Sequence, residues 1–273
     1  MTHFAIIIIG DEILSGKRAD KHLPKAIELL GARGLQMAYA DYVGDDKARI
    51  TSTLARAFAS ARESGDVVFS CGGIGATPDD HTRQCAAAAL GVELALHPEA
   101  KALITERMQD TAKEQGIAFD PDRHDNIHRL NMGVFPVGAE IIPNPYNKIP
   151  GFSCKAGQGA VHFLPGFPVM AWPMIEWVLD HQYAHLHQKS AYIEKSVIVL
   201  GSMEATLTPL MEAIEVAHAG VKVFSLPSVD HPVYGRHIEL GVKGAPTEID
   251  SAYLALLEGL KIFDVKLGPE IVR

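Results

Sequence analysis

The stretch Ser70–Thr82 brings three glycines, two threonines and two aspartates together in the sequence SCGGIGATPDDHT, directly after the apolar residues Val67–Phe69. A strand, a glycine turn and a helix start in this order would direct unpaired backbone N–H groups at an anion above a sheet. Gly72, Gly73 and Gly75 permit positive φ and a close approach of the backbone to a ligand. The stretch therefore predicts a phosphate-binding loop, and the alternative is a capped turn with no ligand.

The residues that follow the glycines predict where the next helix begins. Thr77 is a favourable N-cap and Pro78 suits a first helical turn, so the helix should begin between Pro78 and Thr82. Helix electrostatics accounts for one aspartate there, but Asp79 and Asp80 together indicate more. A carboxylate beside a phosphate favours a bridging Mg²⁺ or a base that positions water.

A second acidic pair, Asp11 and Glu12, follows the apolar run Phe4–Ile9. The loops that follow parallel strands open at one edge of the sheet, so both acidic loops should meet the glycine loop there. We expect a metal and phosphate pocket with Asp11, Glu12 and Asp80 as metal ligands and Mg²⁺ or another divalent cation as cofactor. The known alternatives do not fit, because the chain has no GxxxxGK[ST], HExxH or GxSxG motif and no complete Rossmann fingerprint.

Alternating apolar segments and helical patterns position these loops. Strands are expected at 4–9, 35–43, 67–71, 140–142 and 161–164, and helices at 20–31, 45–64, 84–90, 98–115 and 169–186. In the first helix, Leu23, Ile27 and Leu30 are expected to share a buried face. Most of 118–149 shows little periodicity. The alternation predicts a three-layer α/β/α fold with a mostly parallel sheet.

The pattern changes after Ser190. Strands are expected at 193–200, 221–226 and 234–242, and helices at 202–219 and 247–262. This β-α-β-β-α order is typical of a small α+β domain. The predicted domains are 1–188 and 189–273.

Composition limits the classes of partner. The 273 residues carry a net charge of −8, which offers no basic field for nucleic acid or an anionic membrane, so a small phosphorylated ligand is expected. The run Phe4–Ile9 is much shorter than the ~20 residues that cross a bilayer, and it has no signal-peptide pattern, so we expect a cytoplasmic protein. The three cysteines, Cys71, Cys85 and Cys154, lack metal-site spacing and should be buried small hydrophobes.

Several other residue types could contact a ligand or a metal, but each has a simpler structural interpretation. Histidine pairs four residues apart can share one helix face as metal ligands, but without a third ligand at a fixed spacing a solvated helix surface is the favoured interpretation. The arginines could reach a phosphate, and the tryptophans could stack on a base or pack in the core. These residues are His124, His128, His181, His185, His187, Arg123, Arg129, Trp172 and Trp177. Lys17 and Arg18 follow the first acidic loop, and ligand contact and solvent exposure stay equally open for them.

Five motifs in order resemble the molybdopterin-binding domain of MoaB/Mog proteins and of the competence/damage-inducible protein A (CinA) family. They are Gly10–Glu12 with Ser15, Gly16 and Asp20, then Val43–Asp45, the Cys71–Thr82 loop, Asn144–Phe152 and Leu164–Pro168. The resemblance covers about residues 4–180. It places Asp80 at the family's functional aspartate. It implies that the ligand contacts Gly72, Gly73, Gly75, Thr77, Asp45, Asn144, Pro165, Gly166 and Pro168.

The same resemblance implies a function. It suggests binding of molybdopterin or a nucleotide phosphate and, as in CinA relatives, a metal-dependent pyrophosphatase acting on ADP-ribose-type diphosphates. The tail resembles the KH-like domain of that family, without the GxxG clamp that RNA binding needs. The amidase domain of many CinA proteins is not expected. A homo-oligomer, either a dimer or a trimer, is expected.

The chain departs from the family pattern at two positions. Cys71 stands where the family has threonine before its two glycines, and His22 where many relatives have asparagine. The lost threonine hydroxyl could have bonded a phosphate. These departures motivate an alternative, a non-catalytic ligand-binding or regulatory module on the same scaffold.

Overall fold

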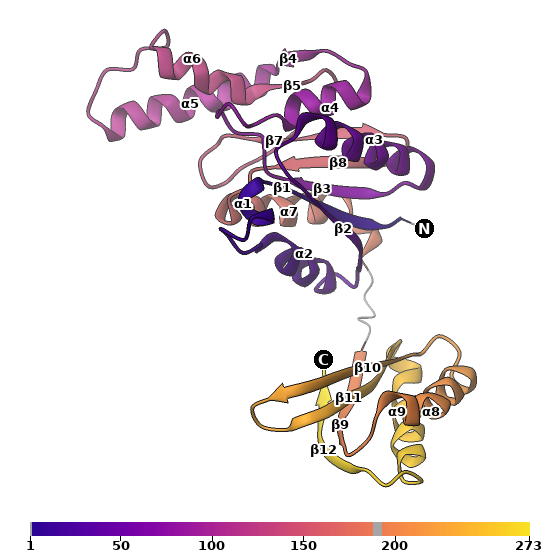
Figure 1. Cartoon of the computed structure of the whole chain (residues 1–273). Coiled ribbons are helices and arrows are strands. Elements are labelled where there is room, and N and C mark those ends of the chain that lie inside the picture. The colour runs from indigo at the N-terminus through magenta and orange to yellow at the C-terminus, as the bar shows by residue number, and fades with distance from the viewer. Residues whose placement is uncertain (1, 188–192) are drawn as a thin grey trace. The chain divides into compact units, whose positions relative to one another are not determined.

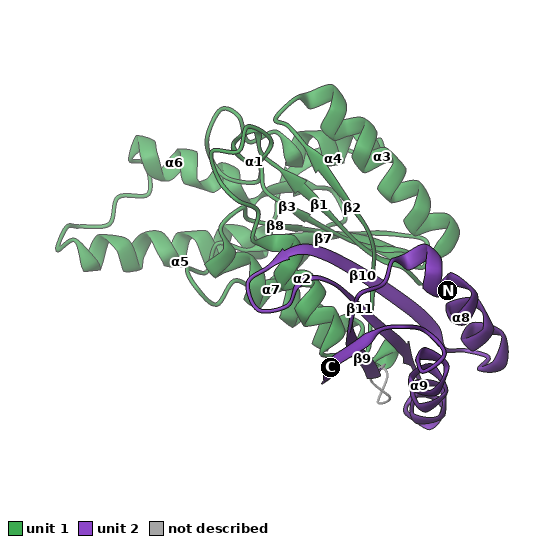
Figure 2. Ribbon diagram, turned by 60° about the horizontal axis from the view of Figure 1, so that its bottom comes forward, with its two compact units in different colours: residues 1–187 green, residues 188–273 purple. Residues whose placement is uncertain are grey.

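The chain forms two compact units, residues 1–187 and 188–273, in a computed structural model that describes residues 2–187 and 193–273 (Figures 1 and 2). The boundary predicted near residue 188 lies outside the described residues. Each unit has its own hydrophobic core. None of the described helices has the length and apolar character that crossing a membrane would need.

Unit 1 is built on a six-stranded sheet with the order β2-β1-β3-β8-β7-β6. Its strands are β1 (Phe4–Ile9), β2 (Met37–Val43), β3 (Val67–Cys71), β6 (Glu140–Ile142), β7 (Gly151–Ala156) and β8 (Gly159–Leu164). The pairs β1–β2, β1–β3 and β3–β8 are parallel, whereas β7 runs antiparallel to both of its neighbours. The predicted mostly parallel sheet is confirmed, and β7 is a strand that the sequence did not indicate.

Helices cover both faces of this sheet (Figure 1). On one face lie α2 (His22–Gly31) and α7 (Pro168–Gln182), and on the other α3 (Lys47–Ser64) and α4 (Thr82–Leu90). Strand β1 alternates between them, since Ile6 and Ile8 join the α2 and α7 core while Ile7 and Ile9 join the other. The three-layer α/β/α fold is therefore confirmed.

Some local predictions were wrong. Ile27, predicted on the buried face of α2, is half exposed at 50%, because Ala26, Leu29 and Leu30 fill the contact with the sheet. Helix α7 ends at Gln182, and a 3₁₀ turn, η2 (Ala184–Leu186), replaces its predicted last turn. Asp11 and Glu12 begin a short helix, α1 (Asp11–Leu14), rather than an open loop.

An excursion between α4 and β6 extends beyond the main sheet (Figure 1). It contains β4 (Leu94–Leu96), α5 (Pro98–Glu114), α6 (His124–Leu130), η1 (Asn131–Gly133) and β5 (Val134–Pro136), with β4 and β5 paired antiparallel. Helix α5 was predicted, but α6 and β5 lie in the span that showed little periodicity. Both are too short to produce a clear repeat.

Unit 2 is an antiparallel sheet, β10-β11-β9-β12, with two helices packed on it. Its elements are β9 (Ile193–Leu200), α8 (Glu204–Ala217), β10 (Lys222–His231), β11 (Gly235–Gly244), α9 (Pro246–Leu260) and β12 (Lys266–Val272). The small α+β domain is confirmed. The edge strand β12 was not predicted, because most of its residues are exposed and Gly268 and Pro269, which are unfavourable in strands, lie in its middle.

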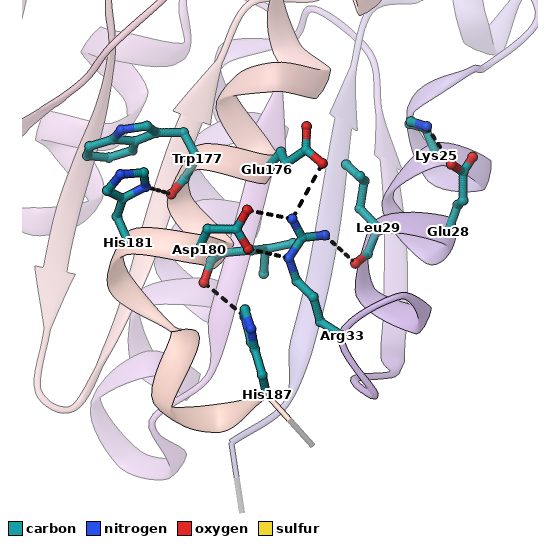
Figure 3. Close-up of polar contacts among 10 residues, drawn as sticks. Lys25, Glu28, Leu29, Arg33, Glu176, Trp177, Asp180, His181 and His187 are labelled. Carbon is teal, nitrogen blue, oxygen red and sulfur yellow. Dashed lines mark hydrogen bonds and ion pairs between the residues drawn. The ribbon is translucent and has the colours of Figure 1, made fainter. Parts of the chain in front are cut away.

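Arg33 joins the two helices on one face of unit 1 (Figure 3). Its Nε and Nη2 donate to Asp180 of α7 at 2.6 and 2.7 Å, and its Nη1 donates to the Leu29 carbonyl at 2.8 Å. The two parallel bonds to one carboxylate fix the angle of the guanidinium as well as its position. The end of α2 is thereby held against α7.

A buried chain of polar groups connects β7 and β8 to the residue that follows α7. The Ser153 hydroxyl lies 2.7 Å from His162 Nδ1, and His162 Nε2 lies 2.8 Å from the Tyr183 hydroxyl. His162 is fully buried, and this burial lowers its pKa from 6.5 to about 3. The neutral imidazole is satisfied on both sides, so it serves the fold and not a reaction.

This buried imidazole predicts a pH dependence of stability. The unfolded chain takes up a proton below pH 6.5 that folded His162 refuses until about pH 3, so stability is lost as the pH falls through this window. The loss attributable to His162 should approach about 1.4 kcal/mol per pH unit. Urea unfolding of the wild type and of His162→Gln between pH 4.5 and 7 measures the difference. Parallel pH profiles of the two proteins would contradict the prediction.

Candidate functional site

A cleft of about 560 Å³ lies at the carboxyl ends of β1, β3 and β8. Most of the residues predicted from sequence line it, namely Glu12, Asp45, Gly72, Gly73, Gly75, Thr77, Asp80, Asn144, Pro165 and Gly166. Two do not line it, Asp11 and Pro168. Parallel α/β sheets bind ligands at this edge, so the cleft is the candidate functional site.

The glycine loop presents its backbone to the cleft. The Gly72 N–H donates to the Leu164 carbonyl at 3.0 Å, and the Gly73 carbonyl accepts from the Thr82 N–H at 3.0 Å. Thr82 also donates its hydroxyl to the Gly72 carbonyl at 3.1 Å. The N–H groups of residues 73–76 have no acceptor within the described part of the chain. Four successive unpaired donors at the rim of a cleft are an arrangement that can bind an anion.

Helix α4 begins at Thr82, at the end of the predicted range, but the predicted N-cap was wrong. Thr77 is not its N-cap, because the helix starts at Thr82 and Thr77 belongs to a separate turn. In that turn the N–H and the hydroxyl of Thr77 donate to Asp80 Oδ2 at 2.8 and 2.5 Å. The second oxygen of Asp80, Oδ1, receives no hydrogen bond from the described residues. Asp80 therefore closes the turn with one oxygen, and its other oxygen is available to accept a further hydrogen bond or to hold a cation.

Arg83 holds the glycine loop in place through a side-chain hydrogen bond, a role that the sequence did not indicate. Its Nη2 donates to the Gly75 carbonyl at 2.8 Å, and its Nη1 donates to the Asn131 carbonyl of η1. Burial lowers the pKa of Arg83, and the nearby Asp80 charge opposes that shift. One buried cation thus connects the glycine loop to the excursion.

Asp11 and Asp45 hold each other across the ends of β1 and β2. The Asp11 N–H donates to Asp45 Oδ2 at 2.9 Å, and the Asp45 N–H donates to Asp11 Oδ1 at 3.2 Å. Burial raises the pKa of Asp45, and the Asp11 N–H opposes this shift, while the charges of Asp11, Glu12 and Asp79 raise the pKa further. Asp11, predicted as a metal ligand, accepts the Asp45 N–H with one of its oxygens, and the site concentrates negative charge.

The carboxylates suit a divalent cation only together with a ligand. Among residues 2–187 and 193–273, no three His, Cys, Asp or Glu side chains are grouped closely enough to hold a metal ion. Glu12, Asp45 and Asp80 nevertheless line one cleft from three separate loops. Mg²⁺ in proteins usually takes one or two carboxylates, substrate phosphates and water. The donor set fits such a cation if phosphate oxygens complete it.

Two further loops form the opposite wall. Asn144 donates Nδ2 to Asn147 Oδ1 and to the Ile149 carbonyl at 2.8 and 2.9 Å, and its Oδ1 accepts from the Tyr146 N–H at 3.0 Å. Its amide is therefore used to shape the loop. Lys148, in the left-handed region with φ of 64°, pairs with Glu106 and Asp110 of α5 at 2.7 and 2.6 Å. This pairing ties the loop to the excursion.

The Leu164–Pro168 loop completes that wall. Pro165, Gly166 and Phe167 line the cleft, while Pro168 occupies the first turn of α7. Apolar side chains from several elements also line the cleft. An isolated apolar residue has no feature in the sequence that would predict contact with a ligand. The residues missed in this way are Met132, Ile149, Pro150, Phe167 and Met170.

Most of the other candidates lie outside the cleft. His124 and His128 do share α6, with their Nε2 atoms 3.2 Å apart, but they are exposed. His181 and His187 bond the carbonyls of Trp177 and Leu179 at 2.8 and 3.1 Å (Figure 3). Arg123 and Arg129 pair with Asp125. All three cysteines are buried and free, as predicted. Of Lys17 and Arg18, only Arg18 lines the cleft.

The fold and cleft define a doubly wound α/β ligand-binding domain followed by a small α+β domain. Residues 5–185 match the family described as "Probable molybdopterin binding domain". The chain therefore belongs to this family, as a CinA-type protein with a MoaB/Mog domain.

Its relatives include a "CinA-like protein" of Anaeromyxobacter dehalogenans, 34% identical over 80% of this chain and 50% of that protein. "Protein TV0584" of Thermoplasma volcanium is 30% identical over 83% of this chain and 81% of that protein. A crystal structure of CinA "with unknown function" from Thermoplasma acidophilum superposes with a TM-score of 0.53 and 26% identity, covering 66% of this chain and 98% of that one. The chain spans about half the length of the CinA-like relatives from Anaeromyxobacter dehalogenans.

The glycine loop generates a matched pair of substitutions. Gly73 and Gly91 have nearly equal φ, 68° and 70°, but a Cβ at Gly73 would overlap Thr82 Oγ1, whereas one at Gly91 would meet nothing within 4 Å. Gly91→Ala should cost about 1 kcal/mol for the left-handed backbone alone. Gly73→Ala should cost at least ~1 kcal/mol more, because Thr82 must move. Equal unfolding free energies for the two variants would contradict this account.

The carboxylate cluster predicts a stabilising substitution. Asp45→Asn can keep the bond from the Asp11 N–H while removing one like charge, so its free energy of unfolding at pH 7 should rise by a few tenths of a kcal/mol (~0.3) after solvent screening. The gain should vanish as the pH falls toward 3.8, the ordinary aspartate pKa, since Asp45 is then protonated. Asp46→Asn is the control, because asparagine can still cap α3 at Arg49 but the negative charge that favours the helix N-terminus is lost, so this variant should lose stability. A destabilised Asp45→Asn at pH 7 would refute the repulsion.

Proposed function

We propose that the protein binds a phosphorylated pterin or nucleotide in this cleft, and that with Mg²⁺ it hydrolyses ADP-ribose-type diphosphates. The observation that carries the proposal is the row of unpaired N–H groups at residues 73–76, opposite the Asp80 Oδ1 and within one cleft. The description of the matched family supports the pterin class. We also expect a homo-oligomer.

Binding would rest on two features of the loop. The N–H groups of residues 73–76 would donate to phosphate oxygens, which needs no side-chain charge in a chain that is acidic overall. The apolar wall with Phe167 and Met170 would take the flat ring of a pterin or base. Anionic repulsion from the carboxylates would then make ligand binding dependent on the cation.

In the enzymatic version, one water oxygen adds to a phosphorus atom and the bond from that phosphorus to the bridging oxygen breaks. The products are two phosphomonoesters, and the proton released by water passes to solvent. Glu12, Asp45 and Asp80 would hold Mg²⁺, which supplies Lewis-acid activation of water and phosphate. Asp80 Oδ1 would position the attacking water, while the loop N–H groups stabilise the charge that develops on phosphate.

A non-catalytic binding module is the second candidate. It is favoured by the reciprocal use of Asp11 and Asp45, which occupies part of the carboxylate set with structural bonds. Cys71 does not favour the non-catalytic module, because its thiol lies in the core shared with α2 and α7 and not in the glycine loop. Calorimetry separates the candidates, since tight binding without product supports the module.

Asp80→Asn tests the enzymatic version. Asparagine can still accept the Thr77 bonds, so the turn should persist while AMP release from ADP-ribose with Mg²⁺ falls about 10²-fold or more. Asp46→Asn, which also removes a carboxylate that accepts an N–H three residues later, should retain full activity.

Three outcomes would count against the proposal. Full activity of Asp80→Asn would remove Asp80 from the reaction. Absence of any diphosphate turnover by the wild type with Mg²⁺ or Co²⁺ would exclude the enzymatic version. Absence of calorimetric binding of every pterin and nucleotide phosphate would exclude both candidates.

A further inference from the structure

Helix α6, in the excursion beyond the main sheet (Figure 1), presents two histidines to solvent. His124 and His128 lie one turn apart, and their Nε2 atoms are 3.2 Å from each other. The rings meet edge to face, with centroids 4.4 Å apart and an angle of 68° between their planes. Because water can satisfy both exposed imidazoles, a hydrogen bond between them adds little stability. Their close approach therefore needs a further reason.

The separation of the two nitrogens is the one that a shared metal ion would set. Zn²⁺ binds histidine nitrogens at about 2.0–2.1 Å in tetrahedral sites. For an ion at this distance from both Nε2 atoms, a nitrogen separation of 3.2 Å corresponds to a nitrogen–metal–nitrogen angle of about 100–105°. This angle is close to the tetrahedral value. The two lone pairs would then point at one cation.

The buried face of α6 holds the histidines in this position. Asn126 lies on the opposite side of the helix, since successive residues are about 100° apart, and it is 3% exposed. Its Nδ2 donates to the Asp120 carbonyl at 2.7 Å, and its Oδ1 accepts from Arg129 at 2.9 Å. These bonds fix one face of the helix inward, so the face with His124 and His128 is fixed outward.

The local charge and the donor type favour a transition metal. Residues 120–129 contain three aspartates and two arginines, so their net charge is −1. Asp125 is paired with Arg123 and Arg129 at 2.5 and 3.3 Å, and no third His, Cys, Asp or Glu side chain completes the site among the residues that the structure describes. The helix thus supplies two ligands, and water would supply the others. Imidazole suits Zn²⁺, Cu²⁺ or Ni²⁺, whereas Mg²⁺ prefers oxygen.

A metal ion here would act on a short element next to the cleft. Helix α6 has seven residues, fewer than an isolated helix needs to be stable. An ion held by residues one turn apart would link that turn to the next. The 3₁₀ turn η1 follows α6 directly, its Asn131 carbonyl accepts from Arg83, and its Met132 lines the cleft. Stabilising α6 would therefore also stabilise one wall of the cleft.

We propose that His124 and His128 bind a transition-metal cation such as Zn²⁺, and that this ion stabilises α6. The site is separate from the carboxylates of the cleft. It uses imidazole nitrogens, and it does not depend on the function proposed for the cleft.

Calorimetry with Zn²⁺ in excess Mg²⁺ tests the site, because Mg²⁺ competes for carboxylates but not for imidazoles. His124→Gln and His128→Gln should each weaken one Zn²⁺ binding event about tenfold or more, since one remaining imidazole loses the advantage of two linked ligands. His181→Gln is the matched control and should leave Zn²⁺ binding unchanged. His181 also precedes a histidine by four residues, but α7 ends before His185, and the His181 Nδ1 bonds a backbone carbonyl.

Hydrogen exchange tests the stabilisation of α6. With Zn²⁺ at about 100 times its dissociation constant, exchange of the α6 amides in the wild type should slow about tenfold or more, because the ion binds the closed helix. His128→Gln should show no such slowing.

Two results would overturn the metal site itself, namely no Zn²⁺ binding by the wild type and unchanged Zn²⁺ affinity in both histidine variants. Weakened binding in the variants with unchanged exchange in the wild type would overturn the stabilisation of α6.

Discussion

The site depends on one crowded point, the backbone of Gly72. A Cβ there would overlap the Ile9 carbonyl, and its N–H donates to the Leu164 carbonyl, so the ends of β1, β3 and β8 converge on this residue. A Cβ at Gly166 would lie 3.4 Å from the Gly72 Cα, which brings the Leu164–Pro168 loop to the same point. Only a residue without a side chain allows three strand ends and two loops to meet here. The cleft forms where these strand ends and loops meet.

The same close approach sets the electrostatics. A Cβ at Gly10 would meet Glu12 Oε2 at 2.8 Å, and one at Gly75 would meet Asp80 Oδ2 at 2.6 Å, so these carboxylates lie directly against glycine backbone. Together with Asp45 they gather like charges that oppose folding at neutral pH. Hydrogen bonds from backbone N–H groups to Asp45 and Asp80 hold the arrangement in place. Carboxylates that repel one another in this way destabilise the fold. Their grouping is therefore better explained by binding of a cation than by a role in stabilising the structure.

The fold and most of the cleft could be predicted because their signals are local. The run Phe4–Ile9 and the glycine loop are each one continuous stretch of sequence. Because loops after parallel strands meet at one edge of the sheet, Glu12 and Asp80 could be predicted to lie in the same site. Arg83 could not be predicted, since its role depends on two carbonyls, at Gly75 and Asn131, that only the tertiary fold brings to it. The same holds for the apolar wall. The predicted N-cap role of Thr77 was wrong, because Thr77 donates to Asp80 in a separate turn and the helix starts only at Thr82.

Cys71 and His22 show how a departure from a motif can be misread from sequence. By position in the motif, Cys71 adjoins the phosphate loop, and its lost hydroxyl pointed to weakened phosphate binding. In the fold, strand alternation turns the Cys71 side chain toward α2, and burial raises the pKa of its thiol far above the ordinary value, which keeps it neutral. The loop backbone is untouched, because its donors are main-chain groups that do not depend on the side chain at this position. The two departures therefore lie beside α2, with Cys71 in its core and His22 against the Gly166 carbonyl, and neither removes a main-chain donor of the loop.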